Sequence, residues 1–169
     1  VEATRIELDK KIKEVYSKIT RKDYRVPVLT EQFELKITST LKEDKVDEVE
    51  VLSTGEGQIT SLSFIGSLVS YARQKTKEKI LSDFSGGDFP IVMDSPFGNL
   101  DQTHTANVAA NIGELASQVI IIVSDKQWNK DVEDNIKNKV GRMYKMFDEN
   151  DNNKHIMETT VITEVQYNG

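Results

Sequence analysis

The chain has 169 residues with 22 Lys and Arg against 28 Asp and Glu, so its formal net charge is −6. This length fits one domain with a sizeable core, and the acidic balance excludes a surface that is basic throughout while permitting a local basic patch. Cysteine is absent and histidine occurs only at His104 and His155, which excludes a disulfide framework and a cysteine-rich zinc site. The longest apolar run, Val119–Val123, is too short to span a bilayer. We therefore expect a cytoplasmic protein without a membrane partner.

The first segment predicts a helix followed by a strand. Apolar residues recur at a 4-3-4 spacing between charged ones, at Leu8, Ile12, Val15 and Ile19. This spacing is typical both of an amphipathic surface helix and of the end of a coiled coil, and both interpretations stay open. Phe33, Leu35 and Ile37 then alternate with polar residues, as in a half-buried strand. The charged stretch from Lys42 to Glu50 is expected to be a solvated loop or hairpin tip.

The segment after Gly57 predicts the longest helix of the chain. Six apolar residues share one broad face that we expect to be largely buried, namely Ile59, Leu62, Ile65, Leu68, Val69 and Ala72. After a turn at residues 85–88, the runs 89–93 and 119–123 read as apolar strands buried on both faces, with a helix at 102–116 between them. A strand, a helix and a strand in this order predict a parallel pair and hence an α/β fold.

The last part of the chain predicts a helix and a terminal β-hairpin. The helix has apolar residues from Trp128 to Val140 and stops at Gly141. Strands at 142–147 and 156–165 flank the polar stretch from Asp148 to Lys154.

The heptapeptide Leu52–Gln58, directly before the long helix, is suited to phosphate binding. Glycines and small residues at a helix N-terminus let backbone N–H groups and a serine hydroxyl approach a phosphate, and the helix dipole favours the negative charge. An ordinary glycine-containing helix cap is the alternative interpretation.

Two further segments follow one another at the end of the first apolar strand. The strand delivers Asp94 to its carboxyl end, where a carboxylate can hold Mg²⁺ beside the phosphates of a nucleotide. Capping of a turn or helix is the alternative role for Asp94. The tight turn Phe97–Asp101 comes next, and Asp101 could equally be the N-cap of the following helix. The three segments in this order are more specific than any one of them.

In this order the segments resemble the C-terminal lobe of the ATP-binding-cassette head of SMC-like ATPases. This class includes the structural-maintenance-of-chromosomes (SMC) proteins, the SbcC exonuclease ATPase and the DndD subunit of DNA phosphorothioation systems. The resemblance covers nearly the whole chain and divides it into a coiled-coil end at residues 1–24 and a head lobe at 25–169. The terminal hairpin, preceded by residues 141–144, looks most like DndD and Lamassu-type defence ATPases.

The resemblance implies a site shared by two heads. The signature motif of one head would close over the γ-phosphate held by the other, with the binding residues Ser53, Thr54, Gly55, Glu56 and Gln58. Asp94 would end the Walker B strand and serve Mg²⁺, and Asp101 of the D-loop would communicate across the interface. The last strand would lead to a switch region at Ser124 and Asp125.

Two positions depart from the pattern of this class. Ser95 stands where a glutamate usually activates the attacking water, and neither Ser124 nor Asp125 is the usual switch histidine. Losing a general base costs about 10²- to 10⁴-fold in rate. We therefore expect hydrolysis that is slow or that recruits another group, with Ser95 at most orienting the water by a hydrogen bond.

The sequence lacks the G-x-x-x-x-G-K-[ST] loop that cradles phosphates. Since the chain also begins with Val1, we interpret it as one lobe of a larger protein whose N-terminal lobe carries Walker A. Expected cofactors are ATP and Mg²⁺, and expected partners are that lobe, a second head, DNA and a nuclease or effector subunit. The expected function is a dimerising ATPase head in DNA repair, DNA sensing or antiphage defence. A non-hydrolysing, ATP-gated clamp or scaffold is the alternative.

Three other signals favour structural roles. Asp148, Asn150 and Asn152 have the spacing of a calcium loop, but the later glycine and glutamate positions hold Asn153 and Thr159. His104 has no second histidine or cysteine at ligand spacing, so a histidine on the helix surface is expected. Trp128 begins an apolar spacing and is expected in the core or in an interface rather than stacked on a base.

Overall fold

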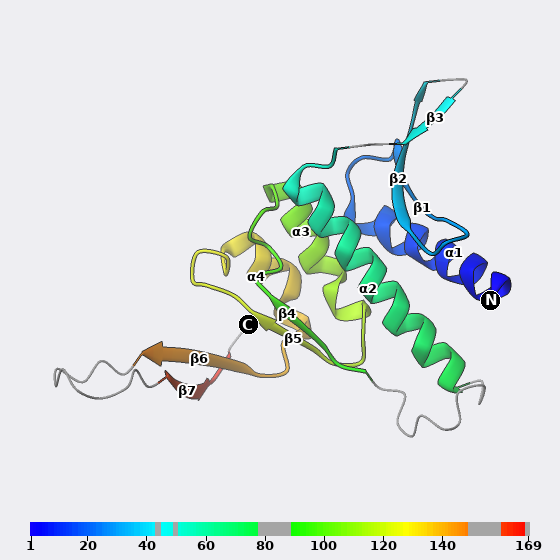
Figure 1. Ribbon diagram of the computed structural model, residues 1–169. Coiled ribbons are helices and arrows are strands. Elements are labelled where there is room, and N and C mark those ends of the chain that lie inside the picture. Colours follow the sequence, from blue (N-terminus) through cyan, green and yellow to red (C-terminus); the bar gives the residue numbers. More distant parts are fainter. Residues whose placement is uncertain (43–44, 49–50, 78–88, 149–159, 168–169) are drawn as a thin grey trace, which may run out of the picture. The chain divides into compact units, whose positions relative to one another are not determined.

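The computed structural model describes residues 1–42, 45–48, 51–77, 89–148 and 160–167. The chain forms two compact units, residues 1–135 and 136–169. Helices and strands alternate along it, so the α/β class expected from the sequence is confirmed (Figure 1). No helix within the described ranges is long and apolar enough to cross a membrane.

Helix α1 (Glu2–Ile19) packs along the longest helix, α2 (Thr54–Lys77), and also contacts strand β1 and helix α3. Its buried residues are Leu8, Ile12, Tyr16 and Ile19. Tyr16 therefore takes the place that the sequence pattern gave to Val15. Leu8 and Ile12 form an apolar cluster with Leu29, on which Leu35, Phe64 and Tyr71 also pack. One face of α1 is thus covered by its own chain.

A three-stranded antiparallel sheet follows α1, in the order β1 (Arg25–Leu29), β2 (Leu35–Lys42) and β3 (Lys45–Glu48) (Figure 1). The predicted strand begins only at Leu35, because Phe33 sits in a turn with a positive φ of 62°. Strands β2 and β3 form a hairpin in the charged stretch that was expected to be a loop or hairpin tip. Residues 43–44 and 49–50 of that stretch lie outside the described residues.

Helix α2 buries only part of the face that its apolar residues predicted, since Ile59 is buried but Ile65 and Leu68 are exposed. Ser63 and Ser67 are completely buried, whereas Ile65 and Leu68 are 44% and 42% exposed. The buried face of α2 therefore includes small side chains, which permit close packing of neighbouring elements. The expectation of a largely buried apolar face is wrong for Ile65 and Leu68.

Strands β4 (Ile91–Asp94) and β5 (Val119–Ile122) form the predicted parallel pair. Helix α3 (Gln102–Asn111) and a 3₁₀ turn (Ile112–Glu114) connect them. Only one face of this pair is covered, because Ile91 and Met93 are buried while Val92 is 61% exposed. The prediction that these strands are buried on both faces is therefore wrong for this chain.

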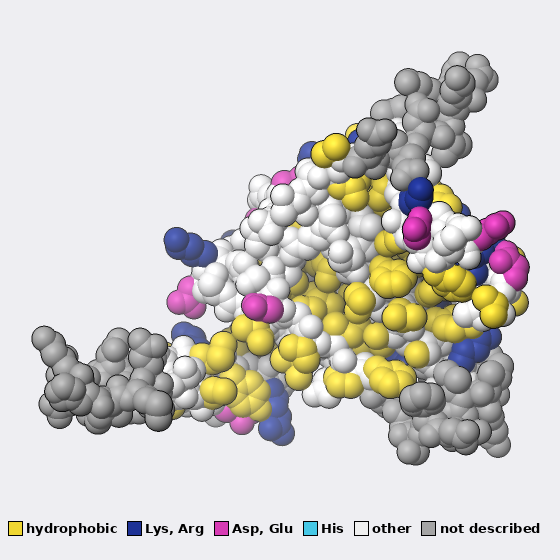
Figure 2. Space-filling model, in the orientation of Figure 1, with side chains coloured by type: hydrophobic (Ala, Val, Ile, Leu, Met, Phe, Trp, Pro, Cys, Tyr) yellow, Lys and Arg dark blue, Asp and Glu magenta, His cyan; other side chains and the backbone are white. Residues whose placement is uncertain are grey.

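The uncovered face of β4 and β5 continues an apolar surface that includes α2. Figure 2 shows apolar side chains gathered over these elements, and the exposed ones are Ile65, Leu68, Val92, Ile120 and Ile122. We call this set the open apolar face. Parallel sheets are almost always covered on both faces, and a two-stranded sheet leaves both outer edges unpaired.

The remaining elements agree with the predicted order. Helix α4 (Lys130–Ile136) and a 3₁₀ turn (Lys137–Lys139) precede the hairpin of β6 (Met143–Asp148) and β7 (Thr160–Val165). Trp128 is partly buried. The turn expected at 85–88 and residues 149–159, which hold most of the calcium-like spacing, lie outside the described residues.

The contacts of α1 lead to a stability prediction. Ile12 is 1% exposed within the apolar cluster, whereas Ile6 on the same helix is 55% exposed. We expect Ile12→Ala to lower the free energy of unfolding by about 2–5 kcal/mol, because it removes buried methyl groups and leaves a cavity. Ile6→Ala is the control and should change stability by less than about 0.5 kcal/mol. Urea unfolding of both variants checks this, and equal losses would place α1 outside the core.

Candidate functional site

Helix α2 begins with a reciprocal capping box between Ser53 and Glu56. The hydroxyl of Ser53 accepts a hydrogen bond from the backbone N–H of Glu56 at 3.3 Å, and the Glu56 carboxylate accepts one from the N–H of Ser53 at 3.0 Å. The helix-cap interpretation of Leu52–Gln58 is therefore realised in the structure. It also leaves Ser53 and Thr54 exposed at the N-terminus of a 24-residue helix, where an anion is favoured.

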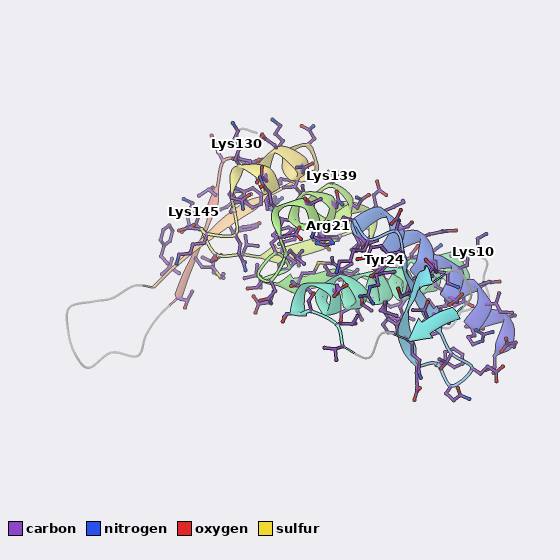
Figure 3. All side chains as sticks on the ribbon, turned by 90° about the horizontal axis from the view of Figure 1, so that it is seen from above. Lys10, Arg21, Tyr24, Lys130, Lys139 and Lys145 are labelled. Atoms are coloured by element: carbon purple, nitrogen blue, oxygen red, sulfur yellow. The ribbon has the colours of Figure 1, made fainter. Side chains whose placement is uncertain are left out.

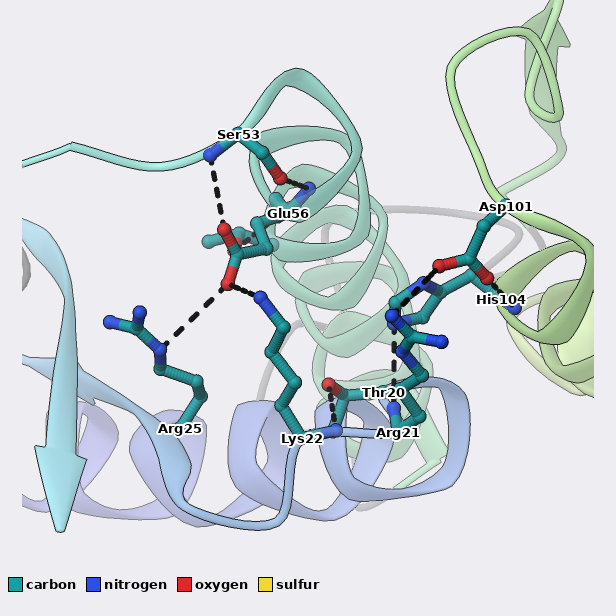
Figure 4. A network of polar contacts seen from close by, with 9 residues as sticks. Thr20, Arg21, Lys22, Arg25, Ser53, Glu56, Asp101 and His104 are labelled. Carbon is teal, nitrogen blue, oxygen red and sulfur yellow. Dashed lines mark hydrogen bonds and ion pairs between the residues drawn. The ribbon is translucent and has the colours of Figure 1, made fainter. Parts of the chain in front are cut away.

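The buried Glu56 carboxylate faces two cationic side chains, one from the turn that follows α1 and one from the start of β1 (Figure 4). The ammonium of Lys22 donates to it at 2.7 Å, and the Arg25 guanidinium lies 3.8 Å away. Burial raises the pKa of Glu56, but hydrogen bonds from Lys22 and Ser53 outweigh burial and lower that pKa to about 2. Glu56 is thus a charged anchor inside the chain.

Gly55 brings the first turn of α2 against the backbone of the next predicted segment. A Cβ at this position would lie 2.7 Å from the carbonyl oxygen of Asn99, closer than real Cβ atoms approach. This contact explains the glycine by packing within the chain. A hollow of about 390 Å³ opens beside it, lined by Arg21, Lys22, Ser53, Thr54, Gly55, Glu56, Asn99, Asp101 and His104. The structure therefore brings together the predicted segments Leu52–Gln58 and Phe97–Asp101.

Asp101 caps helix α3, as the alternative interpretation proposed. One carboxylate oxygen accepts from the backbone N–H of His104 at 2.9 Å, and the other lies 3.0 Å from Nδ1 of the same histidine. Arg21 approaches the second oxygen at 3.5 Å, and these contacts lower the pKa of Asp101, chiefly through the backbone hydrogen bond (Figure 4).

His104 is only 6% exposed, so its expected place on the helix surface is wrong. Its Nε2 accepts a hydrogen bond from the backbone N–H of Arg21 at 3.4 Å. Nδ1 therefore carries the proton of the neutral ring and donates it to Asp101. Figure 3 shows Arg21 between the end of α1 and helix α3. The ring thus joins Asp101 to the turn after α1.

Asp94 and Ser95 stand at the carboxyl end of β4. Asp94 is exposed and accepts a hydrogen bond from the Ser95 hydroxyl at 3.2 Å. Ser95 has a positive φ of 53°, and its N–H donates to the carbonyl of Ile122 at 2.8 Å. The side-chain amide of Gln58 donates to the carbonyls of Ser95 at 3.2 Å and Pro96 at 2.7 Å. Hydrogen bonds therefore also join the remaining predicted segment, at the end of β4, to helix α2.

The predicted switch residues Ser124 and Asp125 are exposed just after β5. They belong to a turn in which the N–H of Gln127 donates to the carbonyl of Ser124 at 2.9 Å. The amide nitrogen of Gln127 lies 2.9 Å from where a Cβ of Gly98 would be, and the carbonyl oxygen of Ser95 lies 3.4 Å from that same point. The loop after β5 thus reaches the turn at residues 95–98.

Sequence reasoning missed the cations and the amide that complete this site. Lys22, Arg25 and Arg21 come from the turn after α1 and from β1, more than 30 residues before their partners, and no local motif marks them. Gln127 had a usable signal, because it follows the carboxyl end of a predicted parallel strand.

The described residues hold no cluster of three or more histidine, cysteine or acidic side chains that could bind a metal alone. Mg²⁺ in nucleotide sites is held by one or two carboxylates together with phosphates and waters. Asp94, as an exposed carboxylate at a strand end, fits that role.

Solved structures with this fold are SMC head domains. One, from work on the structural biochemistry of ATP-driven dimerisation and DNA-stimulated activation of SMC ATPases, has a TM-score of 0.61 at 15% identity, covering 98% of this chain and 87% of that chain. The Smc head domain of Pyrococcus furiosus with an extended coiled coil, bound to the C-terminal domain of ScpA, has a TM-score of 0.58 at 17% identity. That match covers 94% of this chain and 35% of the other.

A third structure, the Smc head domain of Pyrococcus yayanosii with a coiled coil and joint, has a TM-score of 0.60 at 15% identity and matches 96% of this chain and 27% of its own. No protein-family model matches the chain, and no curated protein matches it. These likenesses define the fold as that of an SMC head domain. The chain spans about a quarter to a third of the two Pyrococcus structures.

The buried Glu56 carboxylate predicts a pH-dependent stability. Its pKa in the folded chain, about 2, lies below the ordinary 4.5, so its contribution is complete above pH 4.5 and is lost as the pH falls toward 2. We expect Glu56→Gln to lower the free energy of unfolding by about 2 kcal/mol at pH 7.

The difference between Glu56→Gln and the unmodified chain should shrink as the pH approaches 3, in urea unfolding measured across this range. Glu14→Gln, on the exposed side of α1, is the matched control. A difference that stays constant with pH would contradict the ion pair as the source of the stabilisation.

Two glycines in the same helical turn give a second test. We expect Gly55→Ala to cost about 1–3 kcal/mol, because its Cβ would collide with the Asn99 carbonyl. Gly57→Ala meets no atom within 4 Å and should leave stability unchanged or raise it by up to about 1 kcal/mol. Thermal unfolding of the pair checks this. Equal effects of both substitutions would show that α2 does not pack tightly against the Asn99 carbonyl.

Proposed function

We propose that this chain is the C-terminal lobe of an SMC-like ATPase head, which dimerises on ATP and hydrolyses it slowly. The observation that carries the proposal is the contact between the first turn of α2 and the D-loop, seen at Gly55 and Asn99. This contact brings the exposed Ser53 and Thr54 together with Asp101. The fold likeness to SMC head domains supports the same conclusion.

The open apolar face supports a second lobe as a partner. Val92, Ile120 and Ile122 are exposed on a parallel pair whose outer edges have no neighbouring strand among the described residues. A companion lobe that adds strands to this sheet would bury these side chains and satisfy the edges. We propose that this lobe carries the Walker A loop, which this sequence lacks.

The proposed roles follow the geometry. Ser53 and Thr54 offer their exposed hydroxyls, at the N-terminus of α2, to the γ-phosphate of the nucleotide held by a second head. Asp94 is the residue that would hold Mg²⁺, which neutralises phosphate charge when it is bound. Gly55 and Glu56 shape and anchor the turn. Asp101, fixed by His104 and Arg21, lies at the rim of the same hollow.

Ser95 determines how fast hydrolysis can be. Its hydroxyl donates to Asp94, and serine takes up no proton from water at neutral pH. This observation favours an ATP-gated clamp or scaffold as the second candidate function. The two differ in turnover, because a clamp binds ATP and dimerises without hydrolysis above background.

The finer placement rests on the sequence resemblance alone. It comprises the likeness to SbcC, DndD and Lamassu ATPases, a role in DNA repair, DNA sensing or antiphage defence, and DNA and a nuclease or effector as partners. The relative from Pyrococcus furiosus is bound to ScpA, and a protein of that kind is a further candidate partner.

The test is ATP-driven dimerisation of the assembled head, in which this chain is combined with the lobe that carries Walker A. We expect Ser53→Arg to leave ATP binding by a single head within about twofold while abolishing dimers, because the added cation fills the space facing the partner's phosphate. Ser17→Arg, at an exposed serine of α1, is the control and should dimerise normally. Sedimentation measures both. Full ATP-driven dimers of Ser53→Arg would refute a site formed in trans.

A further inference from the structure

The backbone at Ser95 is held in a conformation that serine rarely adopts. Its φ of 53° lies in the left-handed region, which favours glycine. A residue in such a conformation persists only where its surroundings fix it. Here the N–H of Ser95 donates to Ile122 at 2.8 Å, and its carbonyl accepts from the N–H of Gly98 at 3.1 Å. The first contact joins the turn to β5, and the second closes the turn between Ser95 and Gly98.

The remaining contact comes from helix α2. The amide nitrogen of Gln58 donates to the carbonyls of both Ser95 and Pro96, which uses both of its protons. The amide oxygen of Gln58 is buried and accepts no hydrogen bond from the described residues. Turning the amide over would place this oxygen against two carbonyl oxygens, so the donating orientation is fixed despite the unpaired acceptor.

We propose that Gln58 is a positioning residue that holds Ser95 in its left-handed conformation and so couples the two ATP sites of a head dimer. The proposal rests on the proposed function. Gln58 lies one helical turn after Thr54, on the same rigid helix. Under the proposed function, the first turn of α2 would face the nucleotide of the partner head, and Ser95 would face the nucleotide of its own head. A displacement of α2 on dimerisation is therefore transmitted to the carbonyl of Ser95.

This role differs from that of a nucleotide ligand, which the signature resemblance implies for Gln58. Both donors of its amide are occupied within the chain, so it has none left for a phosphate of the partner. The two roles predict different losses. A positioning residue affects turnover with binding intact, and a ligand in trans affects dimerisation.

The test uses Gln58→Met, which keeps the length of the side chain and removes both donors. The matched control is Gln74→Met at an exposed position near the end of the same helix. In this chain alone, hydrogen–deuterium exchange should become about tenfold faster at the N–H of Gly98, because its acceptor is the Ser95 carbonyl. In the assembled head, kcat should fall by about tenfold or more, while KM for ATP and dimerisation change by less than about twofold.

Gln58→Lys, which supplies a donor of similar reach, should recover most of both losses. Weakened dimerisation with unchanged exchange at Gly98 would overturn the proposal in favour of a ligand in trans. Unchanged exchange together with unchanged kcat would also overturn it. If the assembled head shows no hydrolysis at all, the exchange measurement still decides whether Gln58 holds the turn, so failure of the proposed function is distinguishable. Should Gln58→Met not fold, the comparison of Gln58→Lys with Gln58→Glu, which lacks donors, replaces it.

Discussion

The close packing of the first turn of α2 on residues 95–101 is the constraint on which the site depends. Two contacts produce it, the packing of Gly55 against the Asn99 carbonyl and the hydrogen bonds from the Gln58 amide to the turn after β4. The first contact leaves no room for a Cβ at Gly55, and the second needs a hydrogen-bond donor at position 58. The strand end, the turn and the helix N-terminus are therefore joined to one another, which is what a site assembled from separate segments requires.

Charge ties this body to the helix that precedes it. In the turn after α1, Lys22 pairs with the buried Glu56 and Arg21 pairs with Asp101. The backbone N–H of Arg21 also donates to His104. The buried Glu56 carboxylate is stable only with such partners, so the first turn of α2 depends on the end of α1.

Patterns confined to one element carried over well from the sequence to the structure. The parallel pair, the terminal hairpin and the Asp101 cap were predicted because alternation, apolar runs and capping residues are local properties. The sequence pattern gave wrong predictions of burial where burial depends on which other element packs against a helix or strand. Ile65, Leu68 and Val92 look like core residues but are exposed here, since this chain alone does not cover them. Lys22 and Arg25 had no local signal, because distant segments meet only in the folded chain, and the burial of His104 has the same origin.

The claim that the site is composite is tested most directly by mixing two inactive heads. One carries Ser53→Arg in this chain, and the other has a substitution of the Walker A lysine on the companion lobe. In a mixed dimer, one site combines an intact Walker A loop with an intact signature turn. The account predicts that ATP hydrolysis, absent from either head alone, returns on mixing. Continued inactivity of the mixture, with mixed dimers present in sedimentation, would contradict it.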